Sequence, residues 1–381
     1  MSSPLNNLRI VQAKSKQAIR EFIDFPFRLH APNPYYISAP KAHFATLLNP
    51  LKHPFHQHAS VVYFLARRNG ETVGRIAAIE NYAHNTFHEE NIGFFGFFDA
   101  INDPDVFKAL LNRAAKWLSQ RGLSAMRGPC SFSTNEECGL LVSGFATDPA
   151  IMTPYNPRYY IDCYQHLGLQ KAEDLICWHM DVQSYPQRLI DLTEASLKRL
   201  ERAGKTVVIR TINMKDWDAE LQRVIDIYNK AWEKNWGFIP LTTDEIHFAA
   251  KELKMLVDPD LVLFVEVNGE IAAFSFGIPD YNELLRYCKG NQFSWRLLVS
   301  FMLIRPMIRK FRLLMMGALP EFRNRGLEMM MYTKTREILM RKGYMGGELS
   351  WILERNHNMN NSLKGINSIE SRRYRLFEKA L

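Results

Sequence analysis

The stretch GALPEFRNRGLEMMMYTKTREIL, residues 317–339, decides how the second half of this chain is interpreted. An apolar run, LLMMGALP, breaks into the short basic turn RNRG and then into a run with helical spacing. A helix N-terminus carries free backbone N–H groups and the positive end of the helix dipole, and glycine allows close backbone approach. Flanking arginines add charge-assisted contacts to an anion. The turn at 323–326 therefore predicts a cradle for a pyrophosphate, and the alternative is a basic turn that needed a small residue.

Bulk composition limits the fold and the partners. A chain of 381 residues exceeds what one core usually supports, which favours two domains. A hydrophobic fraction of 47% and a charged fraction of 23% are typical of a globular protein and argue against disorder. The net charge of +8 favours anionic partners, among them a phosphorylated cofactor, an anionic membrane or nucleic acid.

Several features bear on location. The 5 cysteines are few, odd in number and not spaced as CxxC, which favours a reduced cytoplasm. The N-terminal sequence lacks the apolar core of a signal peptide, and no stretch of about 18 apolar residues predicts a transmembrane helix. We expect a cytoplasmic protein whose contact with the inner face of the membrane is peripheral.

The order of predicted elements is the same in both halves of the chain. Each half reads strand, helices, hairpin, strand, helix, strand, helix, strand, and the hairpins turn at Asn69-Gly70 and Asn268-Gly269. We predict an α/β protein with two copies of one unit, at residues 1–183 and 205–381, joined by a helical linker at 184–204. Two unrelated α/β domains are the alternative.

The turn and its surroundings resemble the GNAT superfamily of acyl-CoA N-acyltransferases. In that family R/Q-x-x-G-x-G/A follows a strand, and its amides bind the CoA pyrophosphate. Arg323, Arg325 and Gly326 match this motif, whereas Glu328 stands where Gly or Ala is usual and could crowd or repel a phosphate. The first half resembles the same fold, but DAINDPDVFKAL is acidic where the basic turn should be. The resemblance implies two GNAT-like domains in tandem, each a mixed, mostly antiparallel sheet flanked by helices, with one CoA-binding copy.

The resemblance extends over nearly the whole chain. The segments NPYY, GRIAAI, GFFGFF, FSTNEECGLLV and PYNPRYY are similar to a bacterial tandem-GNAT group of the ceramide synthase type. Members of that group acylate the amine of a sphingoid base from an acyl thioester. This implies a sphingolipid N-acyltransferase with acyl-CoA as co-substrate and a small or lipid amine as acceptor.

The resemblance also assigns residues to acyl-CoA. A backbone N–H near the end of the strand would bind the oxyanion, and in the family a tyrosine often protonates the CoA thiolate. Tyr332 is the substitute available for that tyrosine, with a packed helix residue as the alternative. The residues expected to contact acyl-CoA are Met316, Gly317, Ala318, Leu319, Arg323, Asn324, Arg325, Gly326, Leu327, Glu328 and Asn360.

A second polar cluster lies in GPCSFSTNEECGLLVSGF. Paired carboxylates raise each other's pKa, so Glu136 or Glu137 could act as a general base for an amine, with Asn135 beside them. The alternative is a surface loop in which Asn135 caps a turn. The residues expected to contact the acceptor are Ser133, Thr134, Tyr155, Asn156, Tyr160 and Trp295, although the tyrosines could equally belong to the core.

Two further segments invite functional hypotheses. The apolar and basic segment 291–316 could lie on an anionic membrane, line an acyl-chain tunnel, or pack inside the fold. His53, His56 and His58 have loosely zinc-like spacing but no strong fourth ligand nearby, so we expect no metal.

Two other functional classes remain open. A tRNA-dependent aminoacyl transferase of the Fem type is also a tandem GNAT protein; it would need no CoA turn, and its basic surface would bind tRNA. Glu328 favours that alternative, and Arg323 and Arg325 argue against it. A non-catalytic module that binds acyl-CoA or nucleic acid ranks last, because no nucleic-acid motif stands out.

Overall fold

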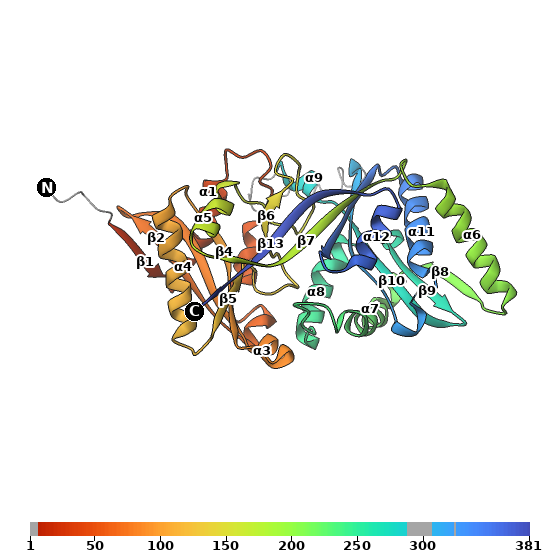
Figure 1. The fold of residues 1–381 in the computed structure, drawn as a ribbon, viewed down its shortest axis with the longest axis horizontal. Coiled ribbons are helices and arrows are strands. Elements are labelled where there is room, and N and C mark those ends of the chain that lie inside the picture. Colours follow the sequence, from red (N-terminus) through yellow and green to blue (C-terminus); the bar gives the residue numbers. More distant parts are fainter. Residues whose placement is uncertain (1–6, 288–306, 324) are drawn as a thin grey trace. The chain divides into compact units, whose positions relative to one another are not determined.

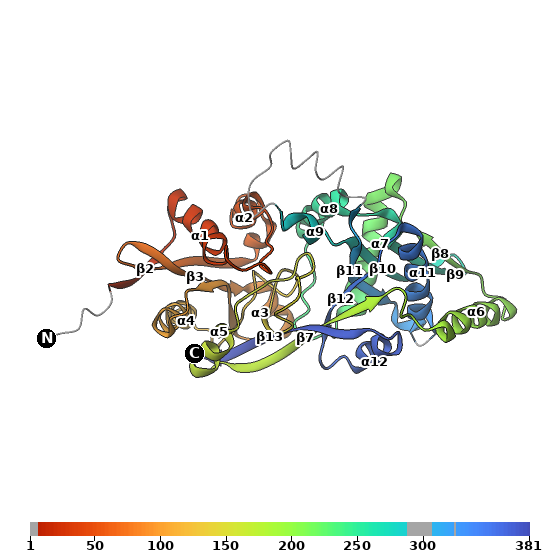
Figure 2. The same cartoon turned by 90° about the horizontal axis from the view of Figure 1, so that it is seen from above.

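The computed structural model describes residues 7–287, 307–323 and 325–381. The chain forms two compact units, each discontinuous in sequence. The first takes its described residues from Met1–Leu175, Leu284–Phe301 and Arg372–Leu381, and the second from Ile176–Glu283 and Met302–Ser371. The predicted boundaries at 183 and 205 divide the chain in sequence order, whereas the last segment of the chain belongs to the first unit. Figure 1 and Figure 2 label the elements in two views.

The first unit is a mixed sheet with helices. Its strands follow the order β1-β2-β3-β4-β5-β13, with β6 beside β13, and β4 and β5 pair in parallel. Its strands are β1 (Leu8–Gln12), β2 (Ala59–Arg68), β3 (Glu71–Asn81), β4 (Ile92–Ala100), β5 (Ala125–Gly128), β6 (Leu140–Ser143) and the later part of β13 (Ile369–Ala380). Its helices are α1 (Lys16–Leu29), α2 (Lys41–Leu47), α3 (Tyr82–His88), α4 (Pro104–Ser119) and α5 (Tyr159–His166).

The second unit has a sheet of the same kind. Its strands follow the order β7-β12-β11-β10-β9-β8, and β11 and β12 pair in parallel. Its strands are the later part of β7 (Gln170–Asp181), β8 (Val207–Thr211), β9 (Val262–Val267), β10 (Glu270–Pro279), β11 (Lys310–Ala318) and β12 (Gly346–Leu353). Its helices are α6 (Gln187–Arg202), α7 (Trp217–Trp232), α8 (Thr243–Leu256), α11 (Leu327–Lys342) and α12 (His357–Gly365), and α9 (Asn282–Leu285) begins in it.

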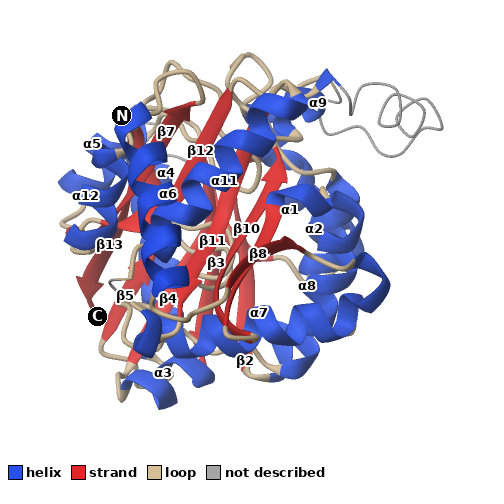
Figure 3. Cartoon of the chain, turned by 90° about the vertical axis from the view of Figure 1, so that its right-hand side faces the viewer, coloured by secondary structure: helices blue, strands red, loops and turns tan. Residues whose placement is uncertain are grey.

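Asn-Gly pairs form the two predicted hairpin turns, and two helices of the second unit contact its sheet. Asn69-Gly70 and Asn268-Gly269 all have positive φ, as a two-residue hairpin loop requires, and both predicted hairpins are confirmed. In the second unit, α7 and α11 both contact β10 and β11, and Figure 3 shows α11 lying along this sheet. None of the described helices is long and apolar enough to cross a bilayer.

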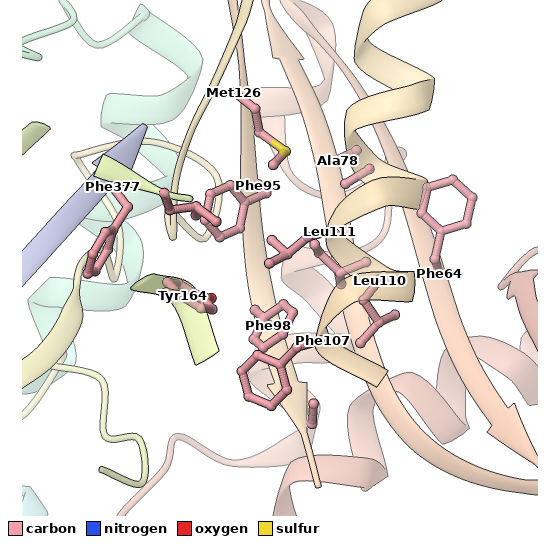
Figure 4. Packing of buried hydrophobic residues seen from close by; sticks show 14 of the residues in the cluster. Phe64, Ala78, Phe95, Phe98, Phe107, Leu110, Leu111, Met126, Tyr164 and Phe377 are labelled. Atoms are coloured by element: carbon pink, nitrogen blue, oxygen red, sulfur yellow. The ribbon is translucent and has the colours of Figure 1, made fainter. Parts of the chain in front are cut away.

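An aromatic core holds the first unit together. Phe107 on α4 packs 4.9 Å from Phe98 and 5.1 Å from Tyr160, measured between ring centroids. Phe377 on β13 lies 5.4 Å from Tyr164 on α5, so the end of the chain completes this core (Figure 4). Large buried aromatic side chains contribute much of the apolar area that stabilises such a core.

Candidate active site

The predicted pyrophosphate turn lies between β11 and α11 of the second unit. A short 3₁₀ helix, Pro320–Phe322, follows β11, and Gly326 then takes the N-cap position of α11 with φ 79°. No described side chain caps this helix, so among the described residues no side-chain oxygen occupies its first N–H groups. Asn324 lies outside the described residues. The left-handed conformation explains why Gly stands at this position, and the cradle stays a prediction.

The two arginines of the turn are both exposed but make different contacts. Arg323 donates to the carbonyl oxygens of Ala231 at 3.1 Å and Ala318 at 3.4 Å, which fixes the turn to α7 and to the end of β11. The guanidinium of Arg325 lies 5.4 Å from the ring centroid of Phe322. Arg323 therefore has a structural task, and a variant of Arg325 tests anion binding more directly.

A bulge in β11 precedes the turn. Phe276 of β10 pairs with Met315 and Gly277 pairs with Leu313, so β11 has one extra residue at 314. The described parallel pairing of β11 with β12 runs from Lys310 to Leu313, whereas β11 continues to Ala318. The two strands therefore pair only over the first part of β11, and the segment beyond the bulge is the place where a ligand backbone could align with β11.

The predicted oxyanion segment, residues 316–319, is held on both sides. The N–H of Leu319 donates to Ala272 O at 2.9 Å, so this amide is already bonded within the sheet. A Cβ atom on Gly317 would lie 2.5 Å from the ring of Trp232, which explains the small residue. Met316 and Ala318 are buried. Leu327 begins α11 and is buried, and Glu328 follows it in the first turn.

Tyr332 and Asn360 lie close to α12. Tyr332 is buried, its Oη contacts Met359 Sδ at 3.2 Å, and burial raises its pKa above the ordinary value, so the hydroxyl is protonated. Asn360 accepts from Trp178 Nε1 at 2.9 Å and donates to the carbonyl oxygens of residues 353 and 354. Its amide hydrogens are thus committed to the fold, and a CoA contact from Asn360 stays a prediction.

The second predicted cluster lies in the first unit, at a cavity of about 90 Å³. Of the residues named from the sequence, Glu137, Tyr155, Asn156 and Tyr160 belong to its lining, whereas Glu136 does not. Several of these residues also have structural partners: Tyr155 Oη donates to Phe145 O at 3.2 Å, and Asn156 exchanges hydrogen bonds with the backbone of Leu141.

The polar segment before Glu137 is ordered by its own hydrogen bonds. Ser133 Oγ accepts from the N–H of Asn135 at 3.1 Å, and Ser133 O accepts from the N–H of Glu136 at 3.2 Å. The side chain of Ser133 therefore caps this turn. Thr134 lies half-buried in the same segment, and Trp295 lies outside the described residues.

Sequence reasoning missed an ionic network beside this cavity. Asp99 at the end of β4 accepts from Arg75 Nε at 2.7 Å and contacts His30 Nε2 at 2.7 Å. Burial raises the pKa of Asp99, but the Arg75 and His30 contacts outweigh it and hold the pKa below the ordinary value. A charged residue inside each of the apolar runs GRIAAI and GFFDA was the available signal.

The three histidines considered for a metal do not form a ligand cluster. His53 Nε2 lies 4.0 Å from Glu136 Oε1, and His56 packs against Phe132 with ring centroids 5.1 Å apart. Within the described ranges, no group of three or more His, Cys, Asp and Glu side chains could hold a metal ion.

Solved structures identify the class of the fold. A tandem GNAT protein from the clavulanic acid biosynthesis pathway aligns with a TM-score of 0.55 at 11% identity, over 98% of each chain. A GCN5-related N-acetyltransferase from Sphaerobacter thermophilus aligns with a TM-score of 0.52 at 11% identity, over 98% of this chain and 95% of that one. The predicted tandem GNAT fold is confirmed.

Sequence relatives identify the family. The bacterial ceramide synthase of Caulobacter vibrioides (strain NA1000 / CB15N) is 34% identical over 383 residues, which is 98% of each chain. Protein YghO of Escherichia coli (strain K12) is 34% identical over 380 residues, or 96% of this chain and 94% of that one. No family model matches the chain. The chain belongs to the bacterial ceramide synthase family, and as a GNAT member of that family it is an N-acyltransferase.

Proposed function

We propose that the protein transfers an acyl group from acyl-CoA to the amine of a hydrophobic acceptor, a sphingoid base. The observation that carries this proposal is the N-terminus of α11, where left-handed Gly326 leaves the helix without a described side-chain cap after a bulged strand. The name of the relative from Caulobacter vibrioides supports the acceptor class. The thioester of acyl-CoA supplies the activated carbonyl, and this chain supplies the groups that bind the substrates and transfer protons.

The second unit holds acyl-CoA in this proposal. The amides of Gly326, Leu327 and Glu328 face the pyrophosphate, because the positive end of the helix dipole favours an anion there. Arg325 adds a charge-assisted hydrogen bond, and Arg323 positions the turn through Ala231 and Ala318. The carboxylate of Glu328 opposes the phosphate, so the affinity for CoA is lower than that of a turn with Gly or Ala there.

The proposed chemistry needs a base and an acid. The amine nitrogen attacks the thioester carbon, the carbon–sulfur bond breaks, and CoA leaves as a thiolate. Glu137 lines the cavity of the first unit whereas Glu136 does not, so Glu137 is the candidate base for an amine held in that cavity. Tyr332 is the candidate acid for the thiolate, since its buried hydroxyl is protonated. Asn135 remains a predicted neighbour of the base.

Calorimetric titration tests the CoA site. Palmitoyl-CoA should bind more tightly than acetyl-CoA or free CoA if an acyl channel accompanies the cradle. Arg325→Gln should weaken palmitoyl-CoA by about tenfold or more, as expected for a lost charge-assisted hydrogen bond. Lys334→Gln, on the same helix and paired with Glu337, is the matched control. An unchanged affinity for palmitoyl-CoA in Arg325→Gln would mean that Arg325 does not bind the pyrophosphate and that the turn is a basic turn without this function.

Turnover tests the base. Glu137→Gln should lower the rate of N-acylation more than it lowers the affinity for palmitoyl-CoA. Glu136→Gln should lower the rate less than Glu137→Gln does. A wild-type rate in Glu137→Gln would rule out its role as the base.

Peripheral contact with an anionic membrane is part of the proposal. Met307 is 65% exposed and directly precedes a basic segment that contains Arg309 and Lys310. An apolar side chain beside basic residues suits a surface of anionic lipid. The protein should sediment with phosphatidylglycerol vesicles at low salt and less at high salt. Equal sedimentation with neutral phosphatidylcholine vesicles would contradict the electrostatic part.

A further inference from the structure

We infer that one edge of the second unit docks on an anionic lipid bilayer through exposed methionines. This inference rests on the membrane contact proposed above and names the surface that makes that contact. The apolar residues of the edge are 68%, 65%, 49% and 67% exposed, and they are Met255, Met307, Met340 and Met345. We call these residues, together with the exposed Arg309 and Lys310, the methionine surface. Exposed apolar side chains that gather in one place mark a contact site for a protein or a membrane.

Three of the methionines lie together at the start of the parallel strands β11 and β12. The N–H of Met345 donates to Arg309 O at 2.8 Å, so the residues that precede the two strands are neighbours. The guanidinium of Arg309 donates to Gly343 O at 3.2 Å, which adds the end of α11. Met307 stands two residues before Arg309, and Met340 stands three residues before Gly343. These hydrogen bonds therefore bring the three methionines to one edge of the unit.

An ion pair brings the fourth methionine to the same edge. The ammonium of Lys342, the last residue of α11, donates to Asp258 Oδ2 at 2.7 Å and lies 2.9 Å from Asp260 Oδ2. Asp258 follows the end of α8, and Met255 stands three residues before it in the last turn of that helix. The end of α8 is therefore tied to the end of α11, where Met340 lies.

The basic side chains of the methionine surface favour an anionic lipid. Arg309 and Lys310 are both exposed, and among the described residues no ion pair joins either side chain to a carboxylate. Glu283 accepts instead from their backbone N–H groups, at 2.7 Å and 3.3 Å. Cationic side chains beside exposed apolar ones suit a bilayer with anionic headgroups, because the apolar tips enter the acyl boundary while the cations stay among the headgroups.

A fluid bilayer suits these residues better than a folded partner does. Methionine is unbranched and flexible, so its side chain adapts to an apolar surface that has no fixed shape. The proposed reaction also supplies a reason for the contact. Its acceptor is a hydrophobic amine, and its amide product carries an additional acyl chain, so both molecules reside in a bilayer.

The position of the methionine surface keeps the proposed CoA site away from the lipid. The turn at 323–326 precedes α11, whereas Met340 and Lys342 lie at the other end of this helix. A helix of 16 residues is about 24 Å long. An anionic bilayer repels the phosphates of CoA within a Debye length, which is about 8 Å at physiological ionic strength. A chain docked through the far end of α11 can therefore still bind CoA from the water.

Oxidation of the methionines in the full-length wild-type chain tests the surface directly. Hydrogen peroxide converts exposed methionines to sulfoxides, and mass spectrometry of peptides measures the rate at each position. Vesicles of a saturated phosphatidylglycerol should slow oxidation of all the methionines of the surface by at least about fivefold. Met152, which is 40% exposed in the first unit, is the matched control and should be oxidised at an unchanged rate. Equal protection of Met152, or no protection by vesicles that sediment the protein, would overturn the inference.

Substitutions separate the apolar part of the contact from the electrostatic part. Met307→Gln combined with Met345→Gln should weaken binding to phosphatidylglycerol vesicles by about tenfold at low and high salt. Lys310→Gln should weaken it by about fivefold at low salt and less at high salt. Met152→Gln is the control and should stay within about twofold of wild type. Wild-type binding in the double methionine variant would contradict the inference, and the exposed methionines would then fit a protein partner.

Titration of the same samples with free CoA reports on the proposed function separately. The double methionine variant should bind CoA as the wild type does, because its changes lie at the other end of α11 from the turn. Protection of the methionines in a chain that binds no acyl-CoA would support the docking surface and contradict the proposed function. CoA binding without protection of the methionines would have the opposite meaning.

Discussion

The bulged strands β4 and β11 occupy equivalent places in the two units, and the helices that follow them begin differently. In β4 the register with β3 shifts between Arg75 and Ala77, as the register of β11 shifts beside Gly277. The next helix of the first unit, α4, is capped by the carboxylate of Asp103, which accepts from the N–H of residue 105. The next helix of the second unit, α11, begins at Gly326 without a described side-chain cap.

The different N-termini of α4 and α11 show how two copies of one fold can differ in their capacity to bind a phosphate. Asp103 fills the positive end of α4 with a carboxylate, and Arg68 pairs with it at 2.7 Å. Pro104 follows at the first helical position and has no N–H to offer. A phosphate would meet an occupied N-terminus in the first unit and, in the second, an N-terminus that no described side chain caps.

Breaking the ionic network of the first unit should give the largest effect. Asp99→Ala would leave Arg75 and His30 buried without their common partner, which should lower the free energy of unfolding by about 3–5 kcal/mol. Urea denaturation measures this loss. Asp148→Ala, which removes the half-buried partner of the exposed Arg286, is the control and should cost less than about 1 kcal/mol. A similar cost in both variants would show that the network contributes little.

The same carboxylate should make stability depend on pH. Asp99 has a lower pKa in the folded chain than its ordinary value, because Arg75 and His30 outweigh the effect of burial. Its contribution is therefore present above the unfolded pKa of about 4 and is lost as pH falls through the folded pKa. The difference in urea midpoint between wild type and Asp99→Asn should shrink as pH drops below about 4. A difference that stays constant with pH would contradict this assignment.

A carboxylate at the N-cap of α11, like that of Asp103 at α4, should remove the difference in CoA binding between the two units. Gly326→Asp places a carboxylate at the N-cap of α11, which should weaken palmitoyl-CoA by about 10–100-fold in calorimetry. Gly326→Ala is the control for backbone strain, because a Cβ there meets no atom within 4 Å. Equal losses in both variants would assign the effect to strain rather than charge.

Removing the side-chain cap of α4 in the first unit should lower stability without creating a CoA site. Asp103→Ala removes the cap of α4 and should cost about 1 kcal/mol in thermal unfolding. Pro104 and Asp105 remain at the helix start, so the stoichiometry of CoA binding should not change. A second bound CoA in this variant would show that the carboxylate of Asp103 alone closes the first unit.

The smallest expected effect concerns Glu328. Glu328→Ala restores the small residue usual in the GNAT motif and removes a negative charge from the first turn of α11. Affinity for CoA should rise by about two- to fivefold, as expected for 0.3–1 kcal/mol at a helix terminus. Glu337→Ala, late in the same helix and exposed, should leave the affinity unchanged. Weaker binding in Glu328→Ala would show that the carboxylate supports the turn.

Local signals predicted the fold and the turn, and distant contacts escaped prediction. Gly326 and the two Asn-Gly hairpins act through neighbouring residues, so their sequence suffices. The network of His30, Arg75 and Asp99 joins three separate segments, and only the register of β3 and β4 brings Arg75 opposite Asp99. The distinction between Glu136 and Glu137 likewise depends on how their segment folds back onto the backbone of Ser131.

The strand β13 has a consequence for the biosynthesis of this chain. Residues 377–380 pair with β5, and Arg375 binds the buried Asp174 at 2.7 Å, both within the first unit. The first unit therefore begins to be synthesised long before the second, but its sheet can close only after translation has passed residue 380. Until then the edge of β5 that pairs with β13 stays exposed in the nascent chain. Such an unpaired strand edge is a binding site for a chaperone.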